Sequence, residues 1–392
     1  MKNHLLPWIL LAFIALAVWY LSRRTAFVFG SKPGWFYVGY ALVFIGSAFF
    51  TFAGARTWTC NPVAHVLFCI FSEILGILLY LLIITVAVDI VQLFAHFPAR
   101  TFGLIVGLLT TGLCVGGTIN AFVPRLTPVT VELNQLQKPV RAVLLSDTHL
   151  GHFRGKRHVQ RLVNMVNKTN PDIVFFTGDC FESPYNLNVE TVEPLKQIKA
   201  PVYFVAGNHD GYVGTDSVKN LLRQVGVNVM DTEVTEDCGL QIVGLDYMRA
   251  DEQDANHMHA PVGNATIESV SKSLINKGNL PIVVLHHNPC GGEYLEKAGV
   301  DLYLAGHTHG GQLYPLIWIN DRVFQFNRGL YRLGNMQVYT SCGSGTFGPP
   351  MRLGTRSEIT VIEMRNQVGD SAAERWNGDE KLNSISYAQR KD

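Results

Sequence analysis

Five short apolar runs in the second half of the chain are each followed by Asp, Asn or His. The polar ends read Ser146-Asp147-Thr148-His149, Gly178-Asp179, Gly207-Asn208-His209-Asp210, His286-His287-Asn288-Pro289 and Gly306-His307-Thr308-His309. Ligands of open α/β sheets gather at the carboxyl ends of the strands. Carboxylate, imidazole and amide oxygen together suit Mn²⁺, Fe or Zn²⁺. The pattern therefore predicts a metal site.

The number and spacing of these residues favour two ions. Asp147 and His149 are two apart, which on an extended strand places both on one face, and His307 and His309 are related in the same way. About seven candidate ligands are too many for one tetrahedral ion, but they suit two ions that share a carboxylate. Two ions about 3.5–4 Å apart can activate water for phosphoryl transfer. A further histidine can protonate the leaving oxygen.

The elements that position these residues read as alternating strands and helices, which predicts an α/β layered fold. The predicted strands are Val140–Ser146, Asp172–Thr177, Val202–Ala206, Leu240–Leu245, Pro281–His286, Leu302–Ala305, Gln337–Ser341 and Glu358–Glu363. Helical patterns cover His158–Lys168, Asp216–Val225 and Thr266–Lys277. We expect a connector at 124–139, a domain at 140–365 and a disordered polar tail at 366–392.

The ordered motif set resembles the calcineurin-like metallophosphoesterase superfamily over roughly residues 140–364. The motifs are Asp147-x-His149, Gly178-Asp179-x-x-Glu182, Gly207-Asn208-His209-Asp210, His287-x-Pro289 and Gly306-His307-x-His309. Gln312 with its two preceding glycines, and Gly343–Arg352, resemble a branch of membrane-associated bacterial phosphoesterases. The resemblance implies a four-layer β-sandwich of two mixed sheets flanked by helices.

The resemblance also implies a role for each motif residue. The first metal would be bound by Asp147, His149, Asp179 and His309, and the second by Asp179, Asn208, His287 and His307. His209 would be the acid or would stabilise the transition state, with Asp210 and Glu182 behind the ligands.

Two more histidines have open roles. His286 points to the opposite face from His287 on an extended strand, so it faces either the core or the substrate. His152 lies at the expected edge of the pocket, where it can touch substrate or simply belong to the surface.

The first 123 residues have a different composition. They hold 6 basic and 2 acidic residues, and uncharged or nearly uncharged apolar runs cover Leu5–Leu21, Trp35–Ala55, Val66–His96 and Thr101–Val123. Four membrane-spanning helices are predicted. Arg23, Arg24 and Lys32 follow the first run, which favours a cytoplasmic first loop and an extracytoplasmic domain. Asp89 is expected at the membrane interface, whereas the place of Glu73 stays open.

Together these features predict an integral protein of the bacterial inner membrane. The expected activity is hydrolysis of a phosphodiester or pyrophosphate by metal-activated hydroxide, with Mn²⁺ the favoured ion. Protein phosphatases of the superfamily carry an Arg after the second motif, and Cys180–Pro184 has none. A lipid-linked substrate is one reading, with Tyr314–Phe326 as a lipid-facing loop or a buried strand pair.

Two other functions stay open: an anchored enzyme of soluble nucleotides, and a non-enzymatic metal-binding membrane protein. A net charge of +1 gives no nucleic-acid-specific surface.

Overall fold

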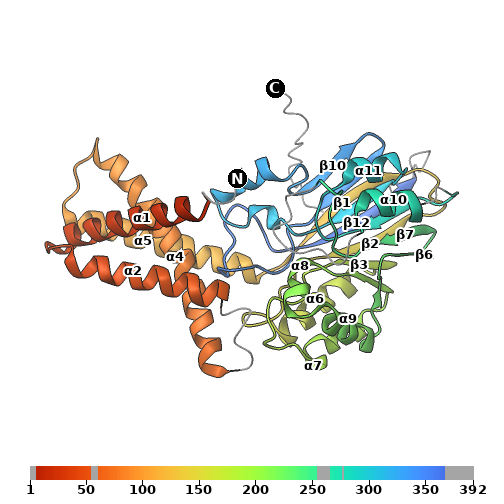
Figure 1. The fold of residues 1–392 in the computed structure, drawn as a ribbon, viewed down its shortest axis with the longest axis horizontal. Coiled ribbons are helices and arrows are strands. Elements are labelled where there is room, and N and C mark those ends of the chain that lie inside the picture. Colours follow the sequence, from red (N-terminus) through yellow and green to blue (C-terminus); the bar gives the residue numbers. More distant parts are fainter. Residues whose placement is uncertain (1–5, 54–60, 254–264, 276–277, 367–392) are drawn as a thin grey trace.

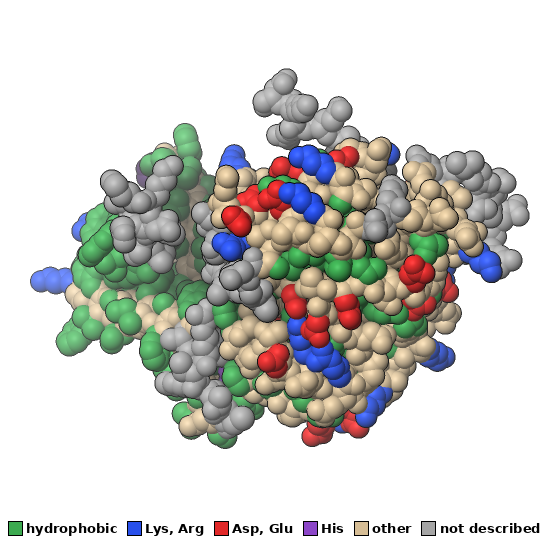
Figure 2. All heavy atoms as spheres, turned by 45° about the vertical axis from the view of Figure 1, so that its right-hand side comes forward, with side chains coloured by type: hydrophobic (Ala, Val, Ile, Leu, Met, Phe, Trp, Pro, Cys, Tyr) green, Lys and Arg blue, Asp and Glu red, His purple; other side chains and the backbone are tan. Residues whose placement is uncertain are grey.

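The computed structural model describes residues 6–53, 61–253, 265–275 and 278–366. A bundle of long helices forms one end of the molecule and a layered α/β domain forms the other (Figure 1). Hydrophobic side chains cover the helical end, whereas the domain surface carries scattered charges of both signs (Figure 2). The predicted tail beyond Asn366 lies outside the described residues.

The N-terminal part contains the four predicted apolar helices. They are α1 (Leu6–Phe29), α2 (Gly34–Ala48, continued by the π-helical turn η2, Phe49–Ala53), α4 (Pro62–Gln92) and α5 (Ala99–Phe122). Each is long and apolar enough to cross a membrane.

Helix α1 continues past the predicted end of the first apolar run, so Arg23 and Arg24 are helical and do not lie in a loop. The Arg24 Nε lies 2.6 Å from Asp89 Oδ2 of α4, and Tyr20 donates to the same carboxylate. Asp89 therefore links α4 to α1. The expectation for Asp89 concerned only its depth in the membrane and did not include this contact.

The domain is built on two six-stranded mixed sheets, which confirms the predicted fold class. The first has the order β1 (Arg125–Leu133), β12 (Glu358–Asn366), β2 (Val140–Leu145), β3 (Ile173–Thr177), β4 (Val202–Val205) and β5 (Asn228–Val229). The second has the order β10 (Gly329–Leu333), β11 (Met336–Thr340), β9 (Leu302–Ala305), β8 (Ile282–Leu285), β7 (Leu240–Gly244) and β6 (Glu233–Asp237).

The central strands are continuous apolar runs because both of their faces are buried. Leu144 and Phe175 of the first sheet pack against Ile242, Leu285 and Leu304 of the second. The other face of the first sheet packs on α6 (Lys156–Lys168), α7 (Val189–Val192) and α9 (Thr215–Gln224). The outer face of the second packs on α10 (Ile267–Leu274) and α11 (Gly292–Lys297).

The segment expected as a connector instead contributes a strand. β1 pairs in parallel with β12 along its whole length, so the sheet begins at Arg125. Its alternating burial, with Val131 and Leu133 inside, is typical of an edge strand, and Pro128 is tolerated there. The proline masked the strand in the sequence.

The two parts of the molecule pack on one another. Met351 is fully buried, and a Cβ at Gly76 of α4 would lie 2.8 Å from its sulfur. The Arg352 amide donates to Gly117 O of α5 (2.9 Å), and Asn120 donates to the carbonyls of Arg352 and Thr355. The loop 349–353 therefore packs against α4 and α5.

The stretch Tyr314–Phe326 is neither a loop nor a strand pair. It contains α12 (Leu316–Val323), which buries Ile317 and exposes Trp318, Ile319 and Val323. Tyr80 of α4 donates to Tyr314 O (2.8 Å), so this apolar surface helix begins beside the membrane-span candidates.

Candidate metal centre

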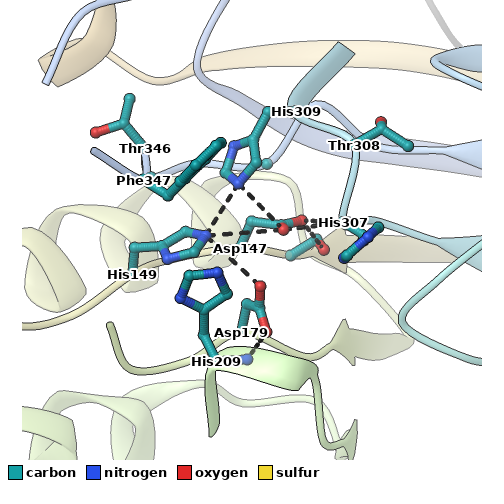
Figure 3. Close-up of polar contacts among 12 residues, drawn as sticks. Asp147, His149, Asp179, His209, His307, Thr308, His309, Thr346 and Phe347 are labelled. Carbon is teal, nitrogen blue, oxygen red and sulfur yellow. Dashed lines mark hydrogen bonds and ion pairs between the residues drawn. The ribbon is translucent and has the colours of Figure 1, made fainter. Parts of the chain in front are cut away.

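The predicted ligands come from the carboxyl ends of five parallel strands in two sheets. Strands β2, β3 and β4 lead to Asp147, Asp179 and Asn208, and strands β8 and β9 lead to His287 and His307. The two sheets face each other, so these ends meet at one edge of the sandwich (Figure 3).

The ligand loops leave the extended conformation at once. Asp147, His149, Asp179, His307 and His309 all have positive φ, between 45° and 72°. The expectation that Asp147 and His149 share a strand face is therefore wrong, because β2 ends at Leu145 and both residues follow the strand with positive φ. Left-handed backbone at non-glycine residues costs about 1–3 kcal/mol each and is concentrated at functional sites.

One group of donors consists of Asp147, His149 and His309. The two Nε2 atoms of the histidines are 3.0 Å apart, and Asp147 Oδ1 lies 3.5 Å from His309 Nε2 and 3.9 Å from His149 Nε2. All three side chains are buried. Their ligand atoms lie close enough to one another to hold one ion.

A second group consists of Asp179, His287 and His307, with Asn208 beside it. His287 Nε2 lies 3.1 Å from Asp179 Oδ2 and 3.3 Å from His307 Nδ1. Asn208 Oδ1 is 2.8 Å from His307 Nδ1. Asp179 Oδ2 is also 3.7 Å from His149 Nε2 of the first group, so this carboxylate lies between the two.

The donor chemistry of these groups fits divalent cations. His287 donates through Nδ1 to Thr177 O (2.7 Å), which turns the lone pair of Nε2 toward the carboxylate of Asp179. His149 directs Nδ1 to Glu182 (2.6 Å), so its Nε2 likewise faces the other group members. Histidines whose second ring nitrogen bonds a carboxylate or a backbone carbonyl are oriented in the way that is usual for metal ligands.

Glu182 connects the first group to His209. Its Oε2 is 2.6 Å from His149 Nδ1 and 2.7 Å from His209 Nδ1. Burial favours neutral His209, but the carboxylates of Glu182 and Asp179 outweigh it and raise the pKa of His209 to about 9. Burial likewise favours protonated Glu182, but His209 and His149 lower its pKa to about 2. Glu182 therefore holds His209 beside the donors and favours its protonated form.

The remaining predicted residues lie behind the centre or away from it. The carboxylate of Asp210 accepts hydrogen bonds from the backbone amides of Gly207 (2.9 Å) and Phe181 (3.1 Å), so it holds two ligand loops together. His286 faces the core, where its Nδ1 lies 2.7 Å from Asn288 O. His152 contacts α4: its Nδ1 lies 3.0 Å from His65 Nδ1, and its ring stacks on Phe68 at 4.3 Å.

The sequence reasoning missed two residues that contact the centre. Arg352 is fully buried and places Nη2 3.0 Å from His309 Nδ1, while it also donates to the carbonyls of Cys342 and Gly345. Phe347 places its ring 5.6 Å from that of His309 (Figure 3). The available signal was the run of small residues before Arg352. A Cβ at position 343 would lie 2.5 Å from the Cβ of Asp147. Position 343 must therefore be glycine for the loop to pack against this ligand.

Comparison with known proteins finds the same family that the sequence motifs resemble. Residues 140–311 match the family of calcineurin-like phosphoesterases. A transmembrane protein with metallophosphoesterase domain of Danio rerio is 33% identical over 276 residues, which cover 66% of this chain and 61% of that protein. An uncharacterized metallophosphoesterase of Helicobacter pylori strain J99 is 29% identical over 62% of this chain and 64% of its own.

Among solved structures, GAP50, the anchor in the inner membrane complex of Plasmodium, is 14% identical with a TM-score of 0.37. That match covers 57% of this chain and 79% of the other. The chain spans about three fifths of the length of the curated relatives named above. The two facing mixed sheets, the order of the motifs and the match of residues 140–311 identify this part of the chain as a calcineurin-like phosphoesterase domain.

Proposed function

We propose that the chain is a membrane-anchored phosphoesterase that uses two divalent ions to cleave a phosphodiester or pyrophosphate bond. The observation that carries the proposal is the convergence of two donor groups on Asp179, with His209 held beside them by Glu182. A metal-binding protein without activity would have no use for a protonated histidine fixed at that position.

Each residue has a defined part in this proposal. Asp147, His149 and His309 hold one ion, His287, His307 and Asn208 hold the other, and Asp179 is shared. When bound, the two ions, Mn²⁺ by our preference, lower the pKa of a water molecule and offset the charge on the phosphoryl oxygens. Glu182 holds Nδ1 of His209, so Nε2 is the atom that gives a proton to the leaving oxygen.

We further propose that the substrate is linked to a lipid. Helix α12 exposes Trp318, Ile319 and Val323, and Phe324 at its end places its ring 5.7 Å from that of His307. Exposed apolar side chains therefore lie on a helix that begins beside α4 and ends beside the metal centre. Such a surface fits a substrate whose acyl part stays in the bilayer while its phosphate enters the site.

The placement in the membrane is also a proposal. Arg23 and Arg24 lie in the last two turns of α1, Lys32 follows that helix, and Arg100 lies in the first turn of α5. These ends of α1 and α5 point away from the domain (Figure 1). Lys and Arg near the ends of spanning helices favour the cytoplasmic side of the membrane, and this arrangement would put the metal centre outside the cytoplasm. In a bacterium this would be the periplasmic face of the inner membrane.

The test uses the full chain in detergent micelles, stripped with chelator and reloaded with Mn²⁺. We expect Mn²⁺-dependent cleavage of bis(4-nitrophenyl) phosphate in preference to 4-nitrophenyl phosphate. Asp179→Asn removes the shared carboxylate and abolishes this activity, whereas Asp216→Asn, on the exposed surface of α9, keeps it. Full turnover by the Asp179 variant would refute the assigned centre.

The test for a lipid-linked substrate compares two phosphodiesters in mixed micelles. Both carry a nitrophenyl ester, and the other ester group is methyl in one and hexadecyl in the other. Replacing Trp318 and Ile319 by Ser should lower kcat/KM for the hexadecyl ester alone. Equal effects on both esters would favour the alternative, an anchored enzyme of soluble substrates such as nucleotides.

A further inference from the structure

A cavity open to the surface lies between the long helices, at a distance from the metal centre. It has a volume of about 680 Å³ and residues of all four long helices line it. The last turns of α1, the first turns of α2 and α5 and the second half of α4 surround it, at the end of the bundle away from the domain (Figure 1). We propose that this cavity binds a membrane lipid with an anionic phosphate headgroup.

The polar residues of the cavity carry net positive charge. Arg24 and Arg100 both line it. The carboxylate of Asp89 offsets Arg24, whereas Arg100 is exposed and has no ion pair or hydrogen bond to any residue that the structure describes. Arg23 and Lys32 add charge at the same end. Basic pockets between membrane helices bind the headgroups of anionic lipids.

The side chain of Arg24 is fixed beside the cavity by its neighbours. Asp89 fixes Nε at 2.6 Å, and the guanidinium lies 5.8 Å from the ring centroid of the buried Phe102. Beside it, Tyr40 and Thr25 join their hydroxyl groups across α1 and α2 at 2.9 Å. Both belong to the cavity wall and offer hydroxyl groups to a phosphate ester.

The rest of the wall is apolar and suits an acyl chain. Leu21, Val28, Leu81, Phe102 and Val106 line it, so one cavity offers cationic and hydroxyl groups beside a hydrocarbon surface. A free phosphate ion would use only the polar part. A lipid uses both, which is the reason to prefer a lipid as the ligand.

A glycine on α5 keeps the cavity open. Helices α1 and α5 touch at Gly103, where a Cβ would lie 2.6 Å from Val28. One turn later, a Cβ at Gly107 would meet no described atom within 4 Å, and Gly107 lines the cavity. A leucine at this position can therefore fill the space without a backbone clash, and it raises the helix propensity.

The experiment measures lipid binding by the full chain in a neutral detergent. Native mass spectrometry and the thermal unfolding midpoint are followed while dioleoyl phosphatidylglycerol, dioleoyl phosphatidylcholine or inorganic phosphate is added. We expect one retained phosphatidylglycerol and a raised midpoint, with no comparable effect of the other two. Gly107→Leu should lose the retained lipid, and Arg100→Gln should weaken binding about fivefold, the effect of one basic residue near a headgroup.

Gly116→Leu is the matched control, because Gly116 lies on the same helix, has the same open space at its Cβ and does not line the cavity. It should bind as the unaltered chain does. All three variants should cleave the soluble diester normally, since the cavity and the metal centre are at opposite ends of the molecule, so the proposal can fail without affecting the proposed activity.

Three results would overturn the proposal. One is equal retention of phosphatidylcholine, the second is an equal midpoint shift with inorganic phosphate, and the third is undiminished retention by Gly107→Leu. If Gly107→Leu does not fold, the exposed Arg100→Gln decides, because binding that does not depend on this charge contradicts an anionic headgroup.

Discussion

Glu182 is the residue whose replacement tests the architecture of the centre most directly. One oxygen, Oε2, holds Nδ1 of both His149 and His209, so one side chain supports an expected metal ligand and the expected acid. The substitution Glu182→Gln keeps the size and removes the charge. We expect two separate effects, one on metal affinity and one on the pH dependence of turnover.

The first effect follows from the hydrogen bond to His149. A hydrogen bond to a charged group is worth about 1.5–3 kcal/mol. Replacing a carboxylate that orients a metal-binding histidine typically costs about 10–100-fold in metal affinity or activity. We therefore expect the Mn²⁺ concentration for half-maximal activity to rise by about that factor.

The second effect follows from the charge. The carboxylates of Glu182 and Asp179 raise the pKa of His209 to about 9 against the effect of burial. Without the Glu182 charge that pKa falls. His209 must be protonated to act as the acid, so activity should be lost at a lower pH on the alkaline side than in the unaltered chain.

The assay is a pH series of kcat at saturating Mn²⁺, with a Mn²⁺ titration at pH 7, on the full chain. Glu190→Gln serves as the control, because the Glu190 side chain is 78% exposed and its ion pair is with the surface residue Lys156. A Glu182 variant with unchanged Mn²⁺ half-saturation and an unchanged alkaline limb would refute the reasoning.

Two further predictions concern neighbouring histidines. His209→Ala should keep both metal ions and lower kcat by about 10²–10⁴-fold, measured by elemental analysis and steady-state kinetics, and loss of metal would contradict its role as the acid. His65→Ala removes the stack on Tyr185 (4.4 Å) and the contact with His152, and should cost about 1–3 kcal/mol in the free energy of unfolding. Val66→Ala, on the exposed side of α4, is its control, and equal losses in both would show that the contact contributes nothing.

Much of this organisation can be predicted from the sequence. Strands buried on both faces need continuous apolar runs, so β2, β3, β4, β8 and β9 are all visible in the chain. The residues that follow them are local in sequence, and their chemical types alone indicate a metal. The four apolar helices are visible for the same reason, since length and hydropathy are local properties.

Edge strands and supporting contacts depend on the tertiary structure. β1 and β6 lie at sheet edges, where Pro128 and the acidic residues of Glu233–Asp237 are tolerated, so the apolar signal is weak. Loop 349–353 packs on α4 and α5, and His65 contacts His152. Both contacts join segments about 90 or more residues apart in the sequence. No local pattern encodes such contacts.

The geometry of the centre shows the same division. The amino-acid sequence by itself determined which side chains can bind metal and that they follow strands. Only the tertiary structure decided that the ligand turns have positive φ, that one oxygen of Glu182 serves two histidines, and that Arg352 reaches His309. The reason is physical: left-handed turns and buried charges are unfavourable alone, and they persist only where the packing of both sheets holds them.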